Sequence, residues 1–120
     1  MFLQVLNGNV GIGSATPDAK LTVKGRVHAE EVVVDINVPA DYVFKSSYEL
    51  MSLNEVEQFI KTNNHLPEIP SASEIKENGL NMGEMQNKLL QKVEELTLYM
   101  IELKKENEAL KIQMNEILKK

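Results

Sequence analysis

Few side chains in this sequence are spaced for catalysis or metal binding. Cysteine is absent, which excludes a thiolate nucleophile and a thiolate metal site. His28 and His65 are the only two histidines, and they stand far apart and not at the short spacing of metal ligands. The acidic pair Glu94-Glu95 has no partner that would select one carboxylate as a general acid, and a solvated face is its expected place. We therefore predict no catalytic residues, no metal and no cofactor, and we interpret the chain as an assembly module and not an enzyme.

Three glycines near the N-terminus also have a plainer explanation than ligand binding. Gly8, Gly11 and Gly13 do not have the spacing of a dinucleotide fingerprint, and no Gly-Lys-Ser/Thr follows them as in a phosphate-binding loop. They do not open a predicted helix either. We expect these glycines to form turns.

Charge and hydropathy exclude several classes of partner. Thirteen basic residues against eighteen acidic ones give a net charge of −5, so neither nucleic acid nor an anionic membrane surface is expected to bind. No apolar run approaches the ~20 residues of a membrane-spanning helix. The first four residues, MFLQ, show neither the basic start nor the long apolar run of a signal peptide.

Short strands are expected in residues 1–38. Apolar runs at 2–6, 10–13, 21–23 and 27–36 are separated by turn residues. Asn7-Gly8 is a strong hairpin signal, because both central residues of a type I′ turn need a positive φ, which asparagine and glycine tolerate. The last run is apolar on both faces, which is typical of a strand that other elements cover. A region of this size cannot bury much surface by itself. We therefore expect it to need partner chains.

Residues 39–80 are predicted to hold two short helices. Ser52 and Glu55 form a capping box, and a helix follows over about 53–62 with apolar residues on one face. A second capping box at 71–74 starts another helix, which Asn78-Gly79 should end.

Two other segments of this region are expected to be extended. Residues 42–44 are a short apolar piece, and the prolines in 65–70 disfavour the helical conformation of the residues before them.

The strongest pattern lies in residues 81–120. Apolar residues recur every seventh position from Met82, which defines heptad position d, and the column three residues earlier is position a. Such a repeat over five heptads predicts a coiled coil, in a helix roughly 55–60 Å long whose start Asn81 and Glu84 can cap. We predict that the following nine residues, called the seam below, form an oligomer interface: Leu89, Val93, Leu96, Met100, Leu103, Asn107, Leu110, Met114 and Ile117.

The number of chains in this coiled coil is left open by the residues alone. Asn107 at position a with leucine at d is typical of dimers, and it would penalise wrong registers. Leu90 and Leu118 at position e and Tyr99 at position g widen the apolar stripe, which favours three or more helices. An intrachain helical hairpin is the remaining alternative, but the other predicted helices are too short to cover five heptads.

Two stretches near the N-terminus resemble a known fibre repeat. NVGIG at 9–13, followed by PDAKLTVKG at 17–25, resembles a β-repeat found near the C-termini of phage tail fibres and related bacterial surface proteins.

The remainder of the chain resembles one domain family. DYVFK at 41–45, HLPEIPSA at 65–72, GEM at 83–85 and KLLQKVEELTLY at 88–99 are similar to the C-terminal tail-fibre-type domain common in Bacteroidetes and their phages. The resemblance implies a homotrimer, with a homodimer as the second choice, and a position at the end of a fibre.

That domain is in turn distantly similar to the endosialidase-type intramolecular chaperone. Members drive trimerisation of fibres, and many then cleave themselves off through a Ser-Asp-x-x-x-Lys arrangement. Here Asp41 and Lys45 are in place, but Ala40 stands at the serine position. Because alanine has no nucleophile, we expect the module to stay attached.

The predicted fold class is α+β and elongated, in three regions. Residues 1–38 form short strands at the end of an intertwined β-shaft, residues 39–80 form a small mixed region with two short helices, and residues 81–120 form a long helix in a parallel coiled coil.

The expected function is structural. We predict a trimerisation and folding module at the C-terminal end of a phage tail fibre or related bacterial surface fibre, on the virion or the cell surface, with an upstream fibre shaft as a further partner. One alternative is a fibre tip that itself binds a cell-surface receptor or glycan, which an exposed cluster of Tyr42, Phe44 and Tyr48 would support. Another is an autoproteolytic intramolecular chaperone.

Overall fold

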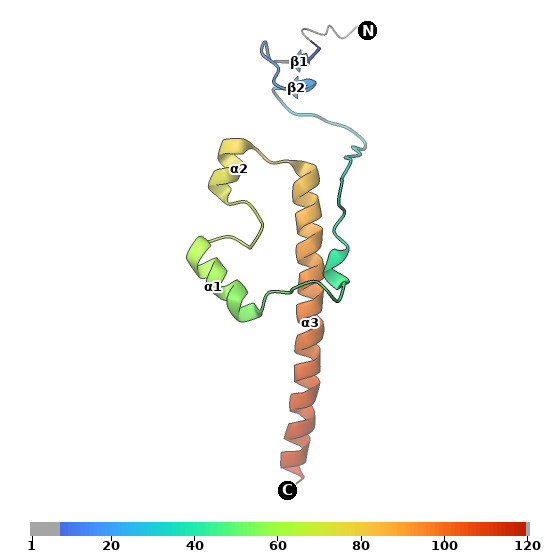
Figure 1. Cartoon of the computed structure of the whole chain (residues 1–120), viewed down its shortest axis with the longest axis vertical. Coiled ribbons are helices and arrows are strands. Elements are labelled where there is room, and N and C mark those ends of the chain that lie inside the picture. The colour runs from blue at the N-terminus through green and yellow to red at the C-terminus, as the bar shows by residue number, and fades with distance from the viewer. Residues whose placement is uncertain (1–7, 120) are drawn as a thin grey trace. The chain divides into compact units, whose positions relative to one another are not determined.

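The structure is a computed structural model that describes residues 8–119. The chain forms two compact units, Met1–Val33 and Val34–Lys120. Along the chain (Figure 1) the elements are β1 (Val10–Ile12), β2 (Leu21–Val23), the 3-10 helix η1 (Tyr42–Phe44), α1 (Leu53–Asn63), α2 (Ala72–Asn78) and α3 (Met82–Leu118). Strands followed by helices, the last of them long, confirm the predicted order of elements. Over residues 8–119, none of the helices is both long and apolar enough to span a membrane.

The first unit is built around a small parallel sheet. Strands β1 and β2 lie where the sequence predicted them and pair in parallel, with Val10 opposite Leu21 and Ile12 opposite Val23. Of the glycines expected in turns, Gly11 lies inside β1, where a Cβ would lie 2.3 Å from the carbonyl oxygen of Ser14, and Gly13 directly after β1 has a φ of +73°. The predicted strand at residues 2–6 lies outside the described residues.

The predicted strand at residues 27–36 is wrong. This segment runs as irregular backbone, and its apolar side chains, such as Val32 and Val33, are exposed. A strand that is apolar on both faces needs a neighbour for its hydrogen bonds and cover for its faces. The single chain supplies neither, since each strand of its sheet is only three residues long.

Both short helices start at the predicted caps. The amide of Glu55 donates to the Ser52 hydroxyl at 3.2 Å before α1, and the amide of Glu74 donates to the Ser71 hydroxyl at 3.2 Å before α2. Helix α2 stops at Gly79, which has a φ of +77°.

Neither segment expected to be extended is so in the structure: one is a 3-10 helix and the other contains a turn. Residues Tyr42–Phe44 form η1 and pack against α3. The amide of Ile69 donates to the Leu66 carbonyl at 3.2 Å, which closes a turn with Pro67 at its second position. Glu68 follows with a φ of +68°, the sign that a type II turn requires at that position. Proline favours this turn, because its fixed φ suits the second position of the turn.

Helix α3 starts differently from the prediction. Among the residues that the structure describes, the Asn81 side chain caps no helix amide; it donates to the Glu84 carboxylate at 3.0 Å instead. Next to this start, Gly83 lies against Val34, and a Cβ at Gly83 would lie 2.5 Å from Val34 Cγ1.

Because Gly83 contacts Val34, the effect of replacing Gly83 should depend on which residue is present at position 34. Alanine is favoured over glycine within a helix by up to about 1 kcal/mol. We expect Gly83→Ala to lower the melting temperature of the otherwise unchanged chain, because the new methyl group meets Val34, and to raise it in a Val34→Ala background. Thermal unfolding of the four variants measures this coupling. The same change in both backgrounds would contradict the contact.

Candidate functional site

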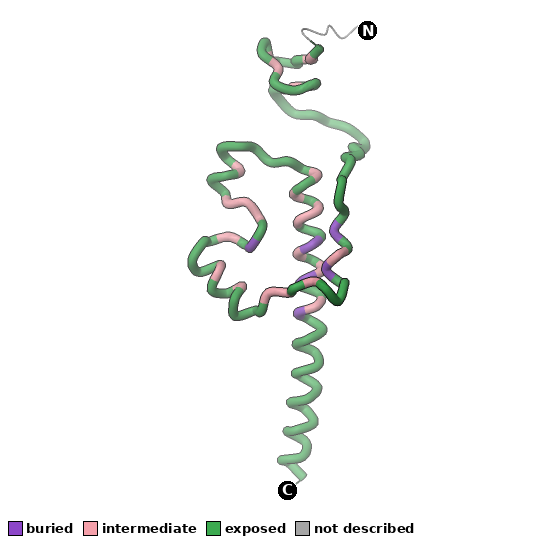
Figure 2. The backbone as a smooth tube through the Cα atoms, viewed as in Figure 1, coloured by how far each residue is buried: buried purple, intermediate pink, exposed green. Residues whose placement is uncertain are grey.

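The second unit is held together by a strap that crosses α3. We call residues 34–51 the strap, and Asn87, Gln91, Glu95 and Tyr99 of α3 the polar column. Figure 2 shows that the buried residues concentrate where the strap meets α3. Asn87 makes the first link: its side chain accepts from the Ala40 amide at 2.7 Å and donates to the Val38 carbonyl at 2.8 Å.

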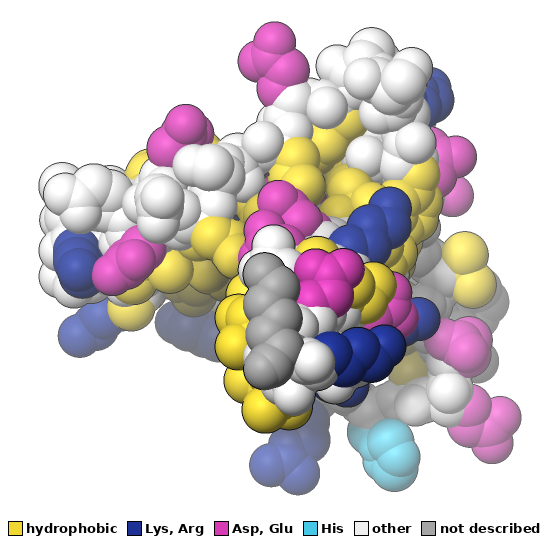
Figure 3. Space-filling view, turned by 90° about the horizontal axis from the view of Figure 1, so that it is seen from below, with side chains coloured by type: hydrophobic (Ala, Val, Ile, Leu, Met, Phe, Trp, Pro, Cys, Tyr) yellow, Lys and Arg dark blue, Asp and Glu magenta, His cyan; other side chains and the backbone are white. Residues whose placement is uncertain are grey.

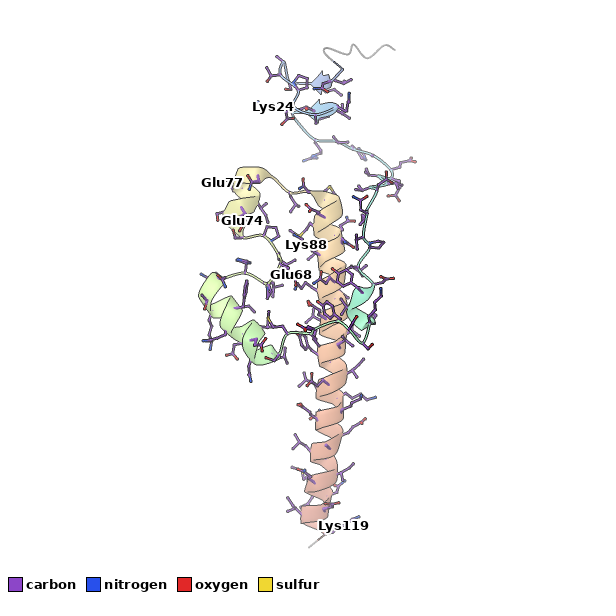
Figure 4. The ribbon with its side chains drawn as sticks, in the orientation of Figure 1. Lys24, Glu68, Glu74, Glu77, Lys88 and Lys119 are labelled. Atoms are coloured by element: carbon purple, nitrogen blue, oxygen red, sulfur yellow. The ribbon has the colours of Figure 1, made fainter. Side chains whose placement is uncertain are left out.

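Gln91 is the centre of the contact and is only 3% exposed. Its carbonyl oxygen accepts from the Tyr42 hydroxyl, and its amide nitrogen lies 3.3 Å from the Tyr48 hydroxyl oxygen. The same nitrogen donates to Glu68 at 3.1 Å. In Figure 4, Glu68 lies on the segment between α1 and α2. Gln91 therefore joins the strap and the turn at residues 66–69 to α3.

Glu95 is 7% exposed and carries a charge at the same contact. It accepts from the Tyr48 hydroxyl at 3.0 Å, and Lys92 neutralises it at 2.9 Å. Lys92 also lies 3.7 Å from Glu68. A buried carboxylate is tolerated only with such partners, so these contacts fix the position of the strap.

Tyr99 completes the column at its C-terminal end. Its hydroxyl donates to the Met51 carbonyl, immediately before α1. Gly83 and the column residues occur at every fourth position, so successive contacts advance by about 40° around the helix. In heptad terms they pass through e, b, f, c and g, across the back of α3 from one flank of the seam to the other.

The seam is left open by this arrangement. Its eight apolar residues are between 48% (Leu89) and 72% (Ile117) exposed, and Asn107 is exposed as well. Viewed along α3 from its C-terminal end, hydrophobic side chains gather on one side of the helix and charged ones on another (Figure 3). From Met100 to the end of the described helix every residue is exposed. The structure thus places all nine predicted interface residues on one helix, with their contact surface facing solvent.

One role expected for a residue beside the seam is wrong, and the feature that would support a binding tip is absent from the described residues. Tyr99 does not widen the apolar stripe, because it is 9% exposed and holds Met51. Tyr42 and Tyr48 are half-buried, with ring centres 5.8 Å apart, so they do not form an exposed aromatic cluster with Phe44.

An apolar groove of about 290 Å³ lies between α1 and α3. Leu53, Val56 and Ile60 of α1 line one side, and Leu66 and Pro67 of the turn close one end. The α3 side includes Leu96, a residue of the seam. The groove is therefore continuous with the seam.

The polar column itself was missed by sequence reasoning. Its signal is the run of polar or amphipathic residues at every fourth position from Asn87 to Tyr99, opposite an apolar seam with a period of 3.5. Charged and polar residues on the back of a coiled-coil helix are usually solvated, so that signal is weak.

Comparison of the chain with protein-family models, with curated proteins and with solved structures finds no match. Over residues 8–119, no group of three or more His, Asp and Glu side chains is placed to hold a metal ion.

All three tyrosines of the chain hydrogen bond within this site, which predicts sensitivity to alkaline pH. Burial, assisted by the hydrogen bond to Glu95, raises the pKa of Tyr48 to about 12, and burial also raises the pKa values of Tyr42 and Tyr99. The unfolded chain loses these protons near pH 10, before the folded chain does. The stability that the strap contributes is therefore complete below about pH 10 and falls as the pH rises toward 12.

A titration that follows tyrosinate absorbance and circular dichroism together measures this effect. We expect tyrosinate to form late and together with loss of structure, and Tyr48→Phe to show a smaller loss of stability over the same pH range. Ordinary titration near pH 10 with intact structure would contradict the buried hydrogen bonds.

Proposed function

We propose that the chain is a structural self-association module that forms a parallel homotrimer through the seam of α3. The observation that carries the proposal is the division of α3 into two surfaces. The strap uses the back of the helix, through polar contacts, and the apolar seam on the opposite face stays exposed along its whole length. A surface with a heptad repeat fits another helix with the same repeat.

The C-terminal part of α3 supports the same proposal. Residues 100–118 are helical yet exposed on every face, and an isolated helix of this length is only marginally stable in water. Association through Met100, Leu103, Leu110, Met114 and Ile117 would bury the apolar side chains that a single chain leaves in solvent. The long helix is thus explained by a partner of the same kind.

Three chains are preferred to two because Leu90 and Leu118 extend the apolar surface beside the seam at position e, where both are exposed. Tyr99 contributes nothing to this preference. Asn107 would meet its equivalents at one level of the trimer and fix the register. In the dimer, which is the second candidate, Leu90 and Leu118 would remain in contact with solvent.

The context we propose is the C-terminal end of a phage tail fibre or a related surface fibre. It is supported by the resemblance of residues 41–45, 65–72, 83–85 and 88–99 to the tail-fibre-type domain. The short parallel strand pair in Met1–Val33, whose residues Ile12 and Leu21 are exposed, suits a shaft completed by other chains. A receptor-binding tip is less supported, because two of the three aromatic residues that would form its surface are turned into the strap contact.

Light scattering and thermal unfolding test the proposed trimer. We expect the mass of three chains, and a melting temperature that falls when the protein is diluted about a hundredfold, because folding is linked to association. A mass of one chain at all concentrations, with a constant melting temperature, would overturn the proposal. A mass of two chains would select the dimer.

A further inference from the structure

We propose that the groove between α1 and α3 receives the α3 helix of a neighbouring copy, so that α1 of each chain clasps the next chain. This inference rests on the proposed parallel homotrimer and names a second contact within it. The groove is the proposed binding surface, and the uncharged residues on the other side of the seam indicate which part of a second copy binds there.

The position of the groove relative to the seam is the first argument. Its α3 wall consists of Leu96 at heptad position d, Lys92 and Tyr99 at g, and Glu95 at c. Helix α1 therefore stands on the g flank of the seam. A helix that packs on Leu96 from a neighbouring chain reaches the groove at the same time, because one residue forms part of both surfaces.

The chemistry of the opposite flank is the second argument. In a parallel bundle the g flank of one helix faces the e flank of its neighbour. The e positions of α3 are Gly83, Leu90, Thr97, Lys104, Lys111 and Leu118. Leu90 and Thr97, which are level with the groove, are uncharged, and the lysines at position e, Lys104 and Lys111, come further along the helix.

The walls of the groove match an uncharged occupant. Leu53, Val56 and Ile60 present an apolar surface, and Leu53 and Ile60 are exposed in the single chain. The charged groups at the α3 side are already paired, Lys92 with Glu95 at 2.9 Å and with Glu68 at 3.7 Å. Glu49 of the strap also lines the groove, so the apolar part of the groove lies along α1, where Leu90 and Thr97 of a second copy bring uncharged side chains.

Disulfide crosslinking tests this contact directly, because the chain contains no cysteine of its own. One chain carries Val56→Cys and the other Thr97→Cys, and the two are unfolded, mixed, refolded and oxidised. Within one chain these positions lie on opposite flanks of the seam, so a disulfide should form only between chains. We expect crosslinked dimers from the mixture and none from either variant alone.

A matched control uses Ile101→Cys in place of Thr97→Cys. Ile101 lies one turn further along α3, at position b on the outer side, and is exposed in the single chain. It should not crosslink to Val56→Cys. Trimers that form no Val56–Thr97 crosslink, or that crosslink equally well through Ile101, would overturn the clasp and leave the trimer standing. Monomers in light scattering would overturn the trimer itself.

A second pair of variants guards against an effect of the cysteines on folding. Val56→Glu and Gln58→Glu add the same charge to α1, but Val56 lines the groove and Gln58 lies exposed outside it. We expect Val56→Glu to dissociate at a protein concentration about tenfold or more above that of Gln58→Glu, because the charge would be buried at the contact. Equal dissociation of the two variants would contradict the clasp.

Discussion

Leu110→Glu should convert the proposed trimer into separate chains. Leu110 occupies position d of the seam, in the part of α3 that the strap does not reach. In the proposed bundle three glutamates would meet at one level of an apolar core, where burying an unpaired charge costs several kcal/mol per chain. Size-exclusion chromatography with light scattering should give the mass of one chain in place of three.

Ile112→Glu is the control for this variant. Leu110 and Ile112 are each 61% exposed in the single chain and lie two residues apart on the same helix. Their surroundings differ only by heptad position, because Ile112 is at f, on the back of the helix. We expect Ile112→Glu to remain a trimer. If both variants dissociate or both remain associated, the seam is not the interface.

Local signals in the sequence predicted the helices well. Ser52 and Ser71 bind amides three residues later, so the information that starts α1 and α2 lies within four positions of each helix start. The long helix was predictable for a similar reason, since a repeat of seven apolar residues is visible along a single chain.

Contacts between distant segments were not predictable in this way. Tyr42 and Tyr48 reach Gln91 and Glu95 across 47 to 49 residues, and nothing near either tyrosine specifies that partner. The expected strand at 27–36 failed for a related reason, because apolar residues allow a strand but do not provide its neighbour. The polar column and the groove thus became visible only once the strap was placed on α3.

Gln91→Ala should release the strap from α3. Gln91 is buried and bonds Tyr42, Tyr48 and Glu68, so its loss leaves polar groups from two separate segments without their partner. Each buried group left unpaired costs about 1–3 kcal/mol, and we expect a loss of about 2–4 kcal/mol in the free energy of unfolding. Hydrogen exchange at the Ala40 amide, which Asn87 protects at 2.7 Å, and tryptic cleavage at the exposed Lys45 should both become faster.

Gln58→Ala provides the control, because it removes the same side chain from an exposed position on α1 and should leave stability and cleavage at Lys45 unchanged.

The oligomeric state of Gln91→Ala tests whether the two surfaces of α3 act independently. Since the strap binds the back of the helix and the seam lies opposite, Gln91→Ala should still associate through residues 100–117, although the chain is less stable. Loss of association together with release of the strap would mean that the strap positions the seam as well as covering the back of the helix. Unchanged exchange at Ala40 would mean that Gln91 does not hold the strap.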